Sequence, residues 1–303
     1  MAKILKYNIR HTTTYQYEEN IDACVMSVCM QPRDHRRQVV QSFFIQTAPQ
    51  ATFSVEFDAF GNRHHYFDIH HRHDRLDITV HAVIEHSFDE SHFDKSELPK
   101  DAWSKLIALK NDWDMWEFLR PTALTTVSPP LTAWIDSSEV NRETNPYKRL
   151  KRLTELMFDS FEYLPGSTHV DSTIDHFLDN RKGVCQDYAH FMLAVAKSWG
   201  IPARYVSGYL YDVSEQAPRA ENATHAWVEC WLPNLGWIPF DPTNNQLDDT
   251  NLVTVAIGRD YRDVAPSRGI AIGGASSDLE VGVTVKRELT ETQTIVAQQQ
   301  AQQ

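Results

Sequence analysis

Alternating apolar and polar positions predict β-strands in the first part of the chain. Four segments there are rich in β-branched and aromatic side chains, namely residues 9–17, 41–46, 53–57 and 76–84. Such side chains favour a pleated, half-buried surface. The segment 58–62, Asp-Ala-Phe-Gly-Asn, follows one of these segments, and its Gly and Asn tolerate the positive φ of a turn. We therefore expect residues 1–92 to form an all-β domain, either a small antiparallel sandwich or a barrel.

Helical periodicity follows in the middle of the chain. The clearest apolar stripe contains Tyr188, Met192 and Val195, whose spacing of i, i+4 and i+7 places them on one face of a helix. Strand patterns then return, and a hairpin is expected from residues 225–232 and 237–240. Strands, helices and strands in this order predict an α+β protein.

The chain is long enough for two domains. It has 303 residues, and a domain contains about 150 residues on average. We assign the second domain to residues 93–290. Within it, residues 279–290 alternate again and are a candidate to pair with the first domain. The tail, residues 291–303, is rich in Gln and Ala and is expected to be disordered.

Composition and charge exclude several classes of protein. The 29 Lys and Arg against 41 Asp and Glu give a net charge of −12, which argues against nucleic acid or an anionic membrane as a partner. No apolar segment reaches the ~20 residues that span a bilayer, and the first residues lack the apolar core of a signal peptide. Four cysteines are too few for a disulfide scaffold. These features predict a reduced, cytoplasmic protein.

Five histidines cluster in the first domain, and they are His64, His65, His70, His71 and His73. One interpretation is a metal site, and the other is a solvated strand face. We favour the solvated face, because no Cys or carboxylate spacing nearby matches a known set of metal ligands. No metal is expected.

Cys185 stands at the start of the helix that carries the apolar stripe. Unpaired N–H groups and the positive end of the helix dipole favour a thiolate at such a position. Together with a cationic neighbour, they can lower a cysteine pKa from ~8.5 to between ~3.5 and ~7.5. A lone cysteine beside an apolar helix is nevertheless more often a core residue, so other residues must decide its role.

The hairpin brings a histidine and an aspartate to one face of a sheet. Ala226 and Val228 are apolar and should face the core, which turns His225 to the opposite face. On the next strand Phe240 faces the core, which turns Asp241 the other way. His225 and Asp241 therefore share a face if the two strands pair with their apolar faces aligned.

This alignment restricts the turn. For the apolar faces to align, two residues that face each other across the strands must have sequence numbers whose sum is even. This condition predicts a three- or five-residue turn with Gly236 in a left-handed bulge position. One such register pairs Asp241 with His225, and another pairs Asp241 with Trp227, a diagonal neighbour of His225. Either register lets the carboxylate reach an imidazole nitrogen.

A thiol, an imidazole and a carboxylate form a nucleophile, base and orienter. Cys185 would attack an amide carbonyl, His225 would pair with the thiolate and protonate the leaving amine, and Asp241 would fix the imidazole. The backbone N–H of Cys185 could donate to the oxyanion, since it is free at a helix start. Tyr163 and Gln186 are candidates for the second donor from their positions alone.

Three motifs at these residues resemble those of the transglutaminase-like superfamily. They are Gly-Val-Cys-Gln-Asp at 183–187, Thr-His-Ala-Trp-Val-Glu at 224–229 and Gly-Trp-Ile-Pro-Phe-Asp-Pro-Thr at 236–243. The resemblance is closest to a bacterial branch described as cysteine proteases, which carries an N-terminal β domain. Marks of that branch are found at residues 11–17, 31–33, 58–62 and 258–266.

The resemblance implies a papain-like α+β core, in which a Cys-bearing helix packs on an antiparallel sheet. It also implies acyl transfer through a thioester, with Cys185, His225 and Asp241 as the triad. Animal crosslinking members bind the oxyanion with a Trp upstream of the Cys, and residues 135–198 contain no Trp. The chain also lacks their acidic calcium loop, so no cofactor is expected.

Three further residues are candidates for the substrate cleft. Trp227 shares a strand face with His225, and Arg259 and Tyr261 follow the Asp241 strand closely. The alternative for Arg259 is a structural Arg–Asp pair that fixes its loop, and we favour this alternative.

Three functions remain open at this point. The leading hypothesis is a cysteine peptidase or amidase that acts on a peptide or protein amide, because water needs no dedicated acceptor site. The second is a transglutaminase, in which an amine accepts the acyl group. The third is a non-catalytic binding scaffold, which the complete triad argues against. The sequence does not indicate an oligomeric state.

Overall fold

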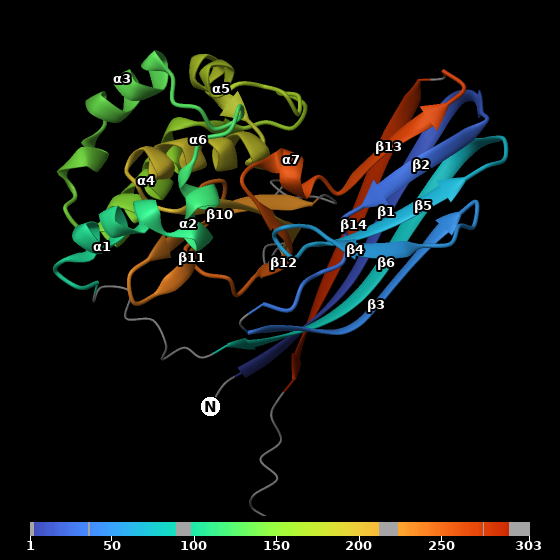
Figure 1. The fold of residues 1–303 in the computed structure, drawn as a ribbon, viewed down its shortest axis with the longest axis horizontal. Helices are drawn as coiled ribbons and strands as arrows, with labels where there is room; N and C mark the ends of the chain where they lie inside the picture. Colours follow the sequence, from blue (N-terminus) through green and yellow to red (C-terminus); the bar gives the residue numbers. More distant parts are fainter. Residues whose placement is uncertain (1–2, 36, 89–97, 212–223, 275, 291–303) are drawn as a thin grey trace, which may run out of the picture.

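The computed structural model describes residues 3–35, 37–88, 98–211, 224–274 and 276–290. Figure 1 shows two halves side by side, one a β-sandwich and the other a mixture of helices and one sheet. The mixed α+β fold with an N-terminal β domain confirms the predicted fold class. In the described ranges, no helix is long and apolar enough to cross a membrane.

The sandwich consists of two four-stranded antiparallel sheets. In chain order, the strands of the first sheet are β1 (Lys3–Ile21), β3 (Gln38–Ala48), β6 (His73–Phe88) and β14 (Ser277–Thr290). Those of the second are β2 (Ala23–Val28), β4 (Ser54–Phe57), β5 (Arg63–Ile69) and β13 (Ser267–Ile272). The spatial orders are β14-β1-β6-β3 and β13-β2-β5-β4.

Strict alternation explains why these residues form a sandwich. On β6, Leu76, Ile78 and Val80 are buried, and they pack against Met26 and Phe67 of the other sheet. The residues between them point outward, because successive side chains of a strand face opposite ways.

The structure corrects the predicted boundary of the second domain. β14 pairs with β1 along its length, from Ser277 opposite Tyr17 to Thr290 opposite Ile4. β13 also belongs to the sandwich, because it pairs with β2, although the sequence analysis left it in the domain spanning residues 93–290. The polypeptide therefore returns to the first domain after about residue 266. The predicted disordered tail lies outside the described residues.

The histidine cluster is divided between the inside and the outside of the sandwich. His65 and His73 are buried, and His70 and His71 are exposed. Among the described residues, no group of three or more His, Cys, Asp or Glu side chains could hold a metal ion. The solvated face that we predicted is thus wrong for His65 and His73, whose strand positions point into the core.

The second half contains short helices around one sheet. In chain order, the helices are α1 (Ala102–Ala108), η1 (Leu109–Asn111), α2 (Trp113–Leu119), α3 (Pro129–Ser137), η2 (Glu139–Arg142), α4 (Pro146–Ser160), α5 (Ile174–Asn180), α6 (Cys185–Ser198) and α7 (Tyr261–Val264). The sheet has the order β11-β10-β9-β12. Its strands are β9 (Ala203–Leu210), β10 (His225–Leu232), β11 (Gly236–Phe240) and β12 (Leu252–Gly258). Two short strands, β7 (Glu162–Tyr163) and β8 (Lys182–Gly183), pair in parallel.

Helix α6 lies in the centre of this half. It packs against β9 and β10 on one side and against α4 and α5 on others. Every residue from Gln186 to Lys197 is buried, which is why its sequence is apolar on more than one face. This packing fixes the position of Cys185, the first residue of the helix.

Two side-chain amides join the halves. Asn62 of the sandwich donates from Nδ2 to the Ile257 carbonyl (2.7 Å) and accepts at Oδ1 from the Ile257 N–H (2.9 Å). Gln38 makes the same pair of bonds with Thr254, at 2.8 and 2.9 Å. β12 is an edge strand, and these amides pair the backbone groups on its open side. The Thr254 carbonyl also accepts from the Arg33 N–H (3.3 Å).

Candidate active site

The start of α6 is held by a local hydrogen-bond network. Val184 precedes the helix with an extended backbone, and its N–H donates to Oδ2 of Asp187 (2.8 Å). Thr168 donates to the same carboxylate oxygen (2.6 Å). Burial raises the pKa of Asp187, although these hydrogen bonds oppose the shift. This arrangement places Cys185 in the first turn, where helix N–H groups have no partner within the helix.

The strand pair β7–β8 brings a tyrosine to the thiol. Tyr163 pairs with Gly183, two residues before Cys185. A side chain at Gly183 could not fit, because a Cβ there would lie 2.6 Å from the Phe177 ring. Burial raises the pKa of Tyr163, and the nearby charges of Cys185 and Asp241 raise it further. The Tyr163 phenol therefore keeps its proton and lies close to both residues.

The β10–β11 hairpin has one of the two predicted registers. Val228 pairs with Phe240 and Leu232 with Gly236, so that three residues form the loop. Gly236 has a φ of 73°, the left-handed conformation expected from the sequence. Continuing the register by one residue sets Asp241 opposite Trp227, diagonal to His225. The parity argument is confirmed.

His225 and Asp241 form a buried pair. Nε2 of His225 donates to Oδ2 of Asp241 at 2.7 Å, and both side chains are almost entirely shielded from solvent. The other carboxylate oxygen accepts from the Thr243 N–H at 3.0 Å. Asn244 donates from Nδ2 to Oδ2 at 2.8 Å. These donors hold the carboxylate in place.

The charge on His225 follows from this environment. Burial lowers the pKa of His225, but the Asp241 carboxylate and the hydrogen bond with Cys185 outweigh burial and raise the pKa to about 10. Because Asp241 engages Nε2, Nδ1 is the ring nitrogen left for Cys185. The structure thus places the three predicted residues Cys185, His225 and Asp241 in one site.

Trp227 covers the imidazole from the side. Its ring lies nearly parallel to that of His225, with centroids 6.1 Å apart and an angle of 23°. It is 1% exposed and packs with Val206, Leu252 and Ile257. The proposed cleft role of Trp227 has no support from this placement, because such a buried ring excludes water from His225 instead of contacting a substrate.

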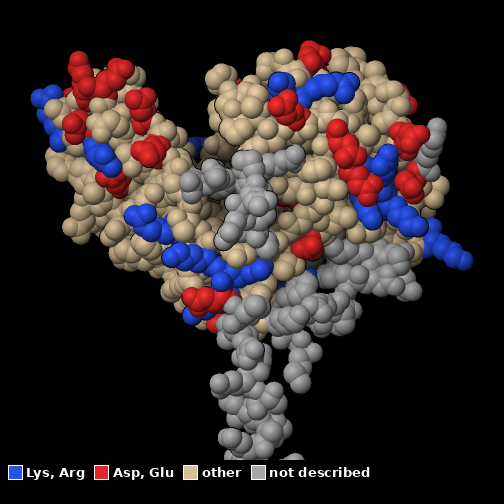
Figure 2. All heavy atoms as spheres, turned by 180° about the vertical axis from the view of Figure 1, so that it is seen from behind, with Lys and Arg blue, Asp and Glu red and all other residues tan. Residues whose placement is uncertain are grey.

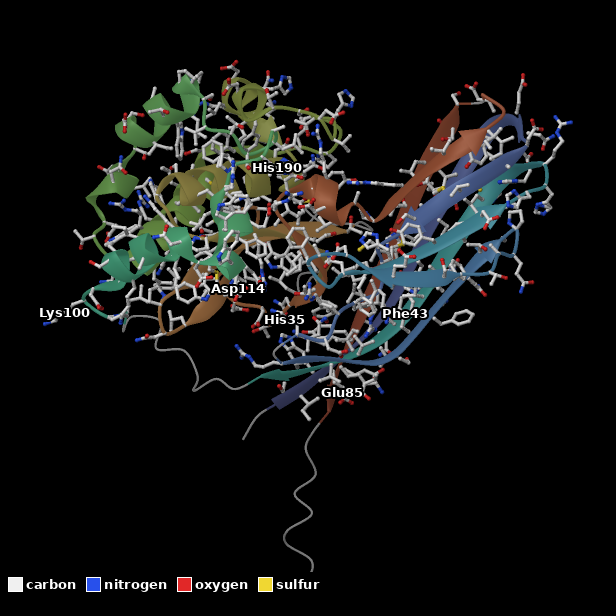
Figure 3. The ribbon with its side chains drawn as sticks, in the orientation of Figure 1. His35, Phe43, Glu85, Lys100, Asp114 and His190 are labelled. Atoms are coloured by element: carbon white, nitrogen blue, oxygen red, sulfur yellow. The ribbon has the colours of Figure 1, made fainter. Side chains whose placement is uncertain are left out.

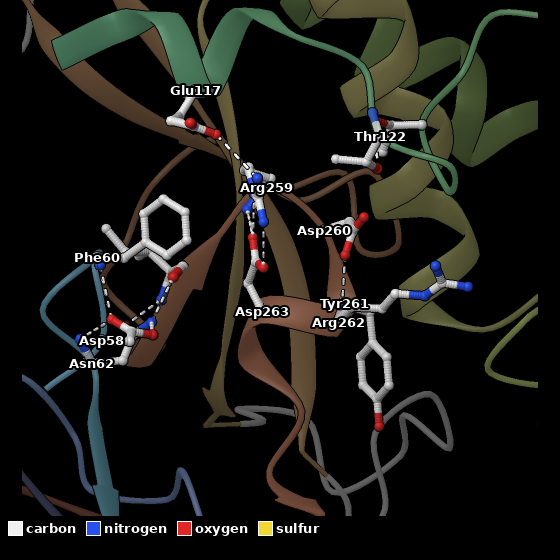
Figure 4. Close-up of polar contacts among 12 residues, drawn as sticks. Asp58, Phe60, Asn62, Glu117, Thr122, Arg259, Asp260, Tyr261, Arg262 and Asp263 are labelled. Carbon is white, nitrogen blue, oxygen red and sulfur yellow. Dashed lines mark hydrogen bonds and ion pairs between the residues drawn. The ribbon is translucent and has the colours of Figure 1, made fainter. Parts of the chain in front are cut away.

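Arg259 forms the structural pair that we favoured (Figure 4). Its guanidinium donates to both carboxylate oxygens of Asp263, at 2.9 and 3.1 Å, and to Glu117 at 3.1 Å. These partners raise the pKa of Arg259, with the Asp263 hydrogen bond as the main cause. These contacts therefore hold the Arg259 side chain against Asp263 and Glu117.

Tyr261 and Gln186 differ in their relation to the thiol. Figure 4 shows the Tyr261 ring directed away from the Arg259 pair. Burial raises the pKa of Tyr261, and the charges of Arg268, Tyr15 and Cys185 also act on it. The Tyr261 ring packs edge-on against Tyr205 of β9, with centroids 6.4 Å apart. The Gln186 side chain instead donates to the Val170 carbonyl (3.0 Å), which fixes a loop and occupies one of its donors.

The sequence analysis missed Asn244 and Thr168. Asn244 lies three residues after Asp241 in a turn, a spacing typical of residues that bond a preceding side chain. That spacing could have suggested its role. Thr168 is nineteen residues from Asp187 in sequence, and no local pattern connects them.

Comparison with known proteins agrees with this geometry. The family model for the transglutaminase-like superfamily matches residues 137–242, which include all three triad positions. The model for the bacterial transglutaminase-like N-terminal region matches residues 7–85. An uncharacterised protein of Mycobacterium leprae is 32% identical over 287 residues, covering 93% of this chain and 99% of its own length. The chain belongs to the transglutaminase-like superfamily. The predicted resemblance is confirmed.

Two other relatives of this transglutaminase-like protein are informative. A protein-glutamine gamma-glutamyltransferase of Pseudomonas aeruginosa is 40% identical over 83 residues, which are 26% of this chain and 12% of that protein. The crystal structure of a "putative cysteine protease" from Cytophaga hutchinsonii matches with a TM-score of 0.74 and 22% identity, over 96% of this chain and 92% of that one. This structural match shows that the two proteins share the fold.

Proposed function

We propose that this protein is a thiol-dependent acyl-transfer enzyme that hydrolyses peptide or other amide bonds. The observation that carries the proposal is the buried His225–Asp241 pair at 2.7 Å. Cys185 at the start of α6 acts together with Asp241 to raise the pKa of this imidazole. A protonated imidazole beside a thiol favours the thiolate, which is the nucleophilic form.

The first half of the reaction acylates the enzyme. The Cys185 thiolate attacks the amide carbonyl, so that a C–S bond forms and negative charge develops on the oxygen. The Cys185 N–H and the Tyr163 phenol, which keeps its proton, are the proposed donors to this oxygen. His225 then gives its proton to the amide nitrogen as the C–N bond breaks. A thioester and a free amine result.

The second half releases the acid. Acylation removes the negative charge of the Cys185 sulfur. Of the two groups that favour a protonated His225, only Asp241 then remains. Neutral His225 takes a proton from water, the oxygen attacks the thioester, and the C–S bond breaks. The products are a carboxylic acid and the thiolate–imidazolium pair. Asp241 keeps the imidazole in one orientation through both halves.

Transamidation is a second candidate function. The local identity to the Pseudomonas aeruginosa gamma-glutamyltransferase favours it, because the same triad serves both reactions. In that case an amine would attack the thioester in place of water. The two reactions differ only in the acceptor.

Alkylation by iodoacetamide from pH 4 to 10, resolved by mass spectrometry for each cysteine, tests the proposed nucleophile. The other cysteines provide an internal control, because burial raises the pKa of Cys29 to about 12 and also raises those of Cys24 and Cys230. We expect Cys185 to react at pH 6 at least tenfold faster than in the His225→Ala variant. Equal rates in the two proteins would remove the basis of the proposal.

A second assay separates the acceptors. β-Casein is incubated with the wild type or the Cys185→Ala variant, with and without monodansylcadaverine. New peptide termini or conversion of Gln to Glu indicate hydrolysis, and dansyl attached to Gln indicates transamidation. We expect hydrolysis in the wild type alone, also when the amine is present. Products of the same kind in the Cys185→Ala variant would exclude the thiol mechanism.

A further inference from the structure

β13 forms an open edge of the sandwich on the side of the active site. It is the terminal strand in the order β13-β2-β5-β4. Two residues separate the end of α7 from the start of β13. Figure 1 shows it as the strand of its sheet nearest to α7. Figure 2 shows, from behind, that the surface is hollowed between the two lobes, with acidic and basic side chains interspersed on both.

The backbone of this edge is available for pairing. The Cys29 N–H donates to the Pro266 carbonyl (2.8 Å), which sets the alternation of an antiparallel pair. Residues 268, 270 and 272 consequently bond to β2, and the N–H and C=O groups of residues 267, 269 and 271 point away from it. Within the described residues no strand pairs with this side of β13.

Two of the outward side chains of β13, Ile270 and Ile272, are apolar, and the third, Arg268, is exposed and charged. Ile270 is 72% exposed and Ile272 is 54% exposed, and Val25 beside Ile270 on β2 is 51% exposed. A Cβ at Gly269 would lie 1.9 Å from Met26, so that position faces the core and its neighbours face outward. A flat apolar edge promotes unwanted strand pairing unless it has a use.

The start of β13 is connected to the nucleophile. Tyr261 begins α7, the helix just before β13, and its N–H donates to Nε2 of His190 (3.2 Å) on α6, the helix that begins at Cys185. The Tyr15 hydroxyl contacts Ser267 at 2.7 Å. A chain that extends along β13 toward α7 thus approaches the half of the molecule that contains Cys185.

We propose that the open edge of β13 binds the acyl-donor polypeptide as an added strand and delivers it to Cys185. The occupant is an extended polypeptide segment with apolar side chains on one face, which would contact Ile270 and Ile272. Backbone hydrogen bonds provide the affinity in this mode, and alternate side chains provide the selectivity. This inference rests on the proposed function, because it assigns protein chains as the substrate class of the same site.

A binding measurement tests the proposal without turnover. Fluorescein-labelled, dephosphorylated β-casein is titrated with the full chain carrying Cys185→Ala, and fluorescence anisotropy is recorded. Adding Ala271→Pro removes an outward N–H without affecting a bond to β2. We expect the Kd to rise about threefold to tenfold, the effect of one lost hydrogen bond.

Val55→Pro is the matched control. The Asp58 N–H donates to the Asn62 carbonyl (3.1 Å), and the same alternation leaves Val55 facing away from β5 at the other edge of the sheet. Its effect on the Kd should be less than twofold. Ile270→Asp changes the exposed side chain alone and should also weaken binding at least threefold.

Thermal unfolding of each variant identifies any variant that fails to fold. If Ala271→Pro fails to fold, Ile270→Asp provides the test. The proposal is overturned if casein does not bind the Cys185→Ala chain, or if Ala271→Pro and Ile270→Asp both bind it as tightly as their parent. Alkylation of Cys185 in the otherwise unchanged wild type reports separately on the proposed function. A failure of the β13 proposal is therefore distinguishable from a failure of the proposed function.

Discussion

Asp241 controls the site at the scale of single residues. Its side chain is fully buried, and it accepts hydrogen bonds from His225, Thr243 and Asn244. A buried carboxylate without partners would be costly. These donors satisfy both carboxylate oxygens, and Asp241 is the main influence that opposes the effect of burial on the pKa of His225.

Asp241→Asn should therefore lower activity through the charge of His225. The amide keeps the size of the side chain, but the pKa of His225, about 10 in the wild type, should fall because burial is no longer opposed by the carboxylate. The imidazole would then be neutral at pH 7. We expect kcat to fall on the order of 100-fold or more, as measured on the casein assay between pH 6 and 9.

Asn244→Ala is the control for this prediction. It removes one donor and leaves the carboxylate, so the loss of kcat should be smaller and the pH profile should keep its shape. Equal losses of kcat in Asp241→Asn and Asn244→Ala would show that the position of the Asp241 side chain matters for activity and that its charge does not.

His190 makes a different prediction, which concerns stability. It lies on α6, within the helical half (Figure 3), and its Nε2 accepts from the Tyr261 N–H at 3.2 Å. Burial lowers the pKa of His190 to about 4, although Asp260 opposes the shift. An unfolded histidine has a pKa of about 6.5. The unfolded chain therefore takes up a proton between pH 6.5 and 4 that the folded chain does not, and stability falls as the pH falls through this range.

At pH 5 this difference amounts to on the order of 2 kcal/mol relative to neutral pH. His190→Gln can retain an acceptor for Tyr261 and has no proton to take up. We expect urea denaturation of this variant at pH 7.5 and pH 5 to show a pH dependence weaker by about that amount. His11, whose pKa burial also lowers to about 4, continues to contribute in both proteins. An unchanged pH dependence would mean that His190 does not remain neutral in the fold.

At the scale of elements, the hairpin β10–β11 sets the register on which the triad depends. Gly236 occupies the bulge position with a φ of 73°, and Asn234 in the same loop has a φ of 67°. A left-handed conformation costs most residues roughly 1–2 kcal/mol, whereas glycine adopts it freely and asparagine with little strain.

Gly236→Ala should consequently destabilise the protein by about 1–2 kcal/mol in urea denaturation. Asn234→Gly is the control, because it changes the other left-handed residue of the same loop to one that adopts this conformation freely. It should change stability by only a few tenths of a kcal/mol. If the two substitutions have the same effect, then the conformation of Gly236 is not what holds this register.

The parity of apolar positions was sufficient to restrict this hairpin to two registers, one of which is observed. Ala226, Val228 and Phe240 face the core, and this pattern alone orients His225 and Asp241. The helix that begins at Cys185 was predictable for a similar reason, because it carries an apolar stripe, whereas the role of Cys185 required the histidine and aspartate motifs as well. Local periodicity constrains side chains that lie within one element or one hairpin. His225 and Asp241, two of the three triad residues, lie in one hairpin.

Other elements have no such local signal. β13 is mainly exposed and short, and its place in the sandwich depends on a partner more than 200 residues earlier. Trp103, Trp113 and Trp116 also do not share one helix, because the side chain of Asp112 accepts from the Asp114 N–H and caps a new helix that begins at Trp113. Long-range pairing and capping override the average periodicity in these segments.

At the scale of the whole molecule, the two halves are coupled through the edge of β12. Asn62 and Gln38 each satisfy a backbone N–H and a backbone C=O of that strand. Asp58 holds Asn62 in turn, accepting from its backbone N–H and its side-chain amide at 2.9 and 2.8 Å. The turn predicted at residues 58–62 is therefore also a contact between the halves.

The double variant Asn62→Ala, Gln38→Ala should uncouple the halves. Asn62→Ala leaves two buried backbone groups of β12 unpaired, and Gln38→Ala leaves one, because the Thr254 carbonyl still accepts from the Arg33 N–H (3.3 Å). Each unsatisfied group costs about 1–3 kcal/mol. All eight tryptophans lie between residues 103 and 237, so tryptophan fluorescence reports on the helical half alone. Circular dichroism reports on both halves.

We expect the two signals to change together in urea for the wild type and to separate in the double variant, with the fluorescence transition at the lower concentration. The fluorescence transition moves first because β12, the strand that loses its partners, belongs to the half that contains the tryptophans. Gln46→Ala, which removes an exposed amide from β3, should leave the transitions coincident. Coincident, unshifted transitions in the double variant would show that the halves are held together by their apolar contacts and not by these amides.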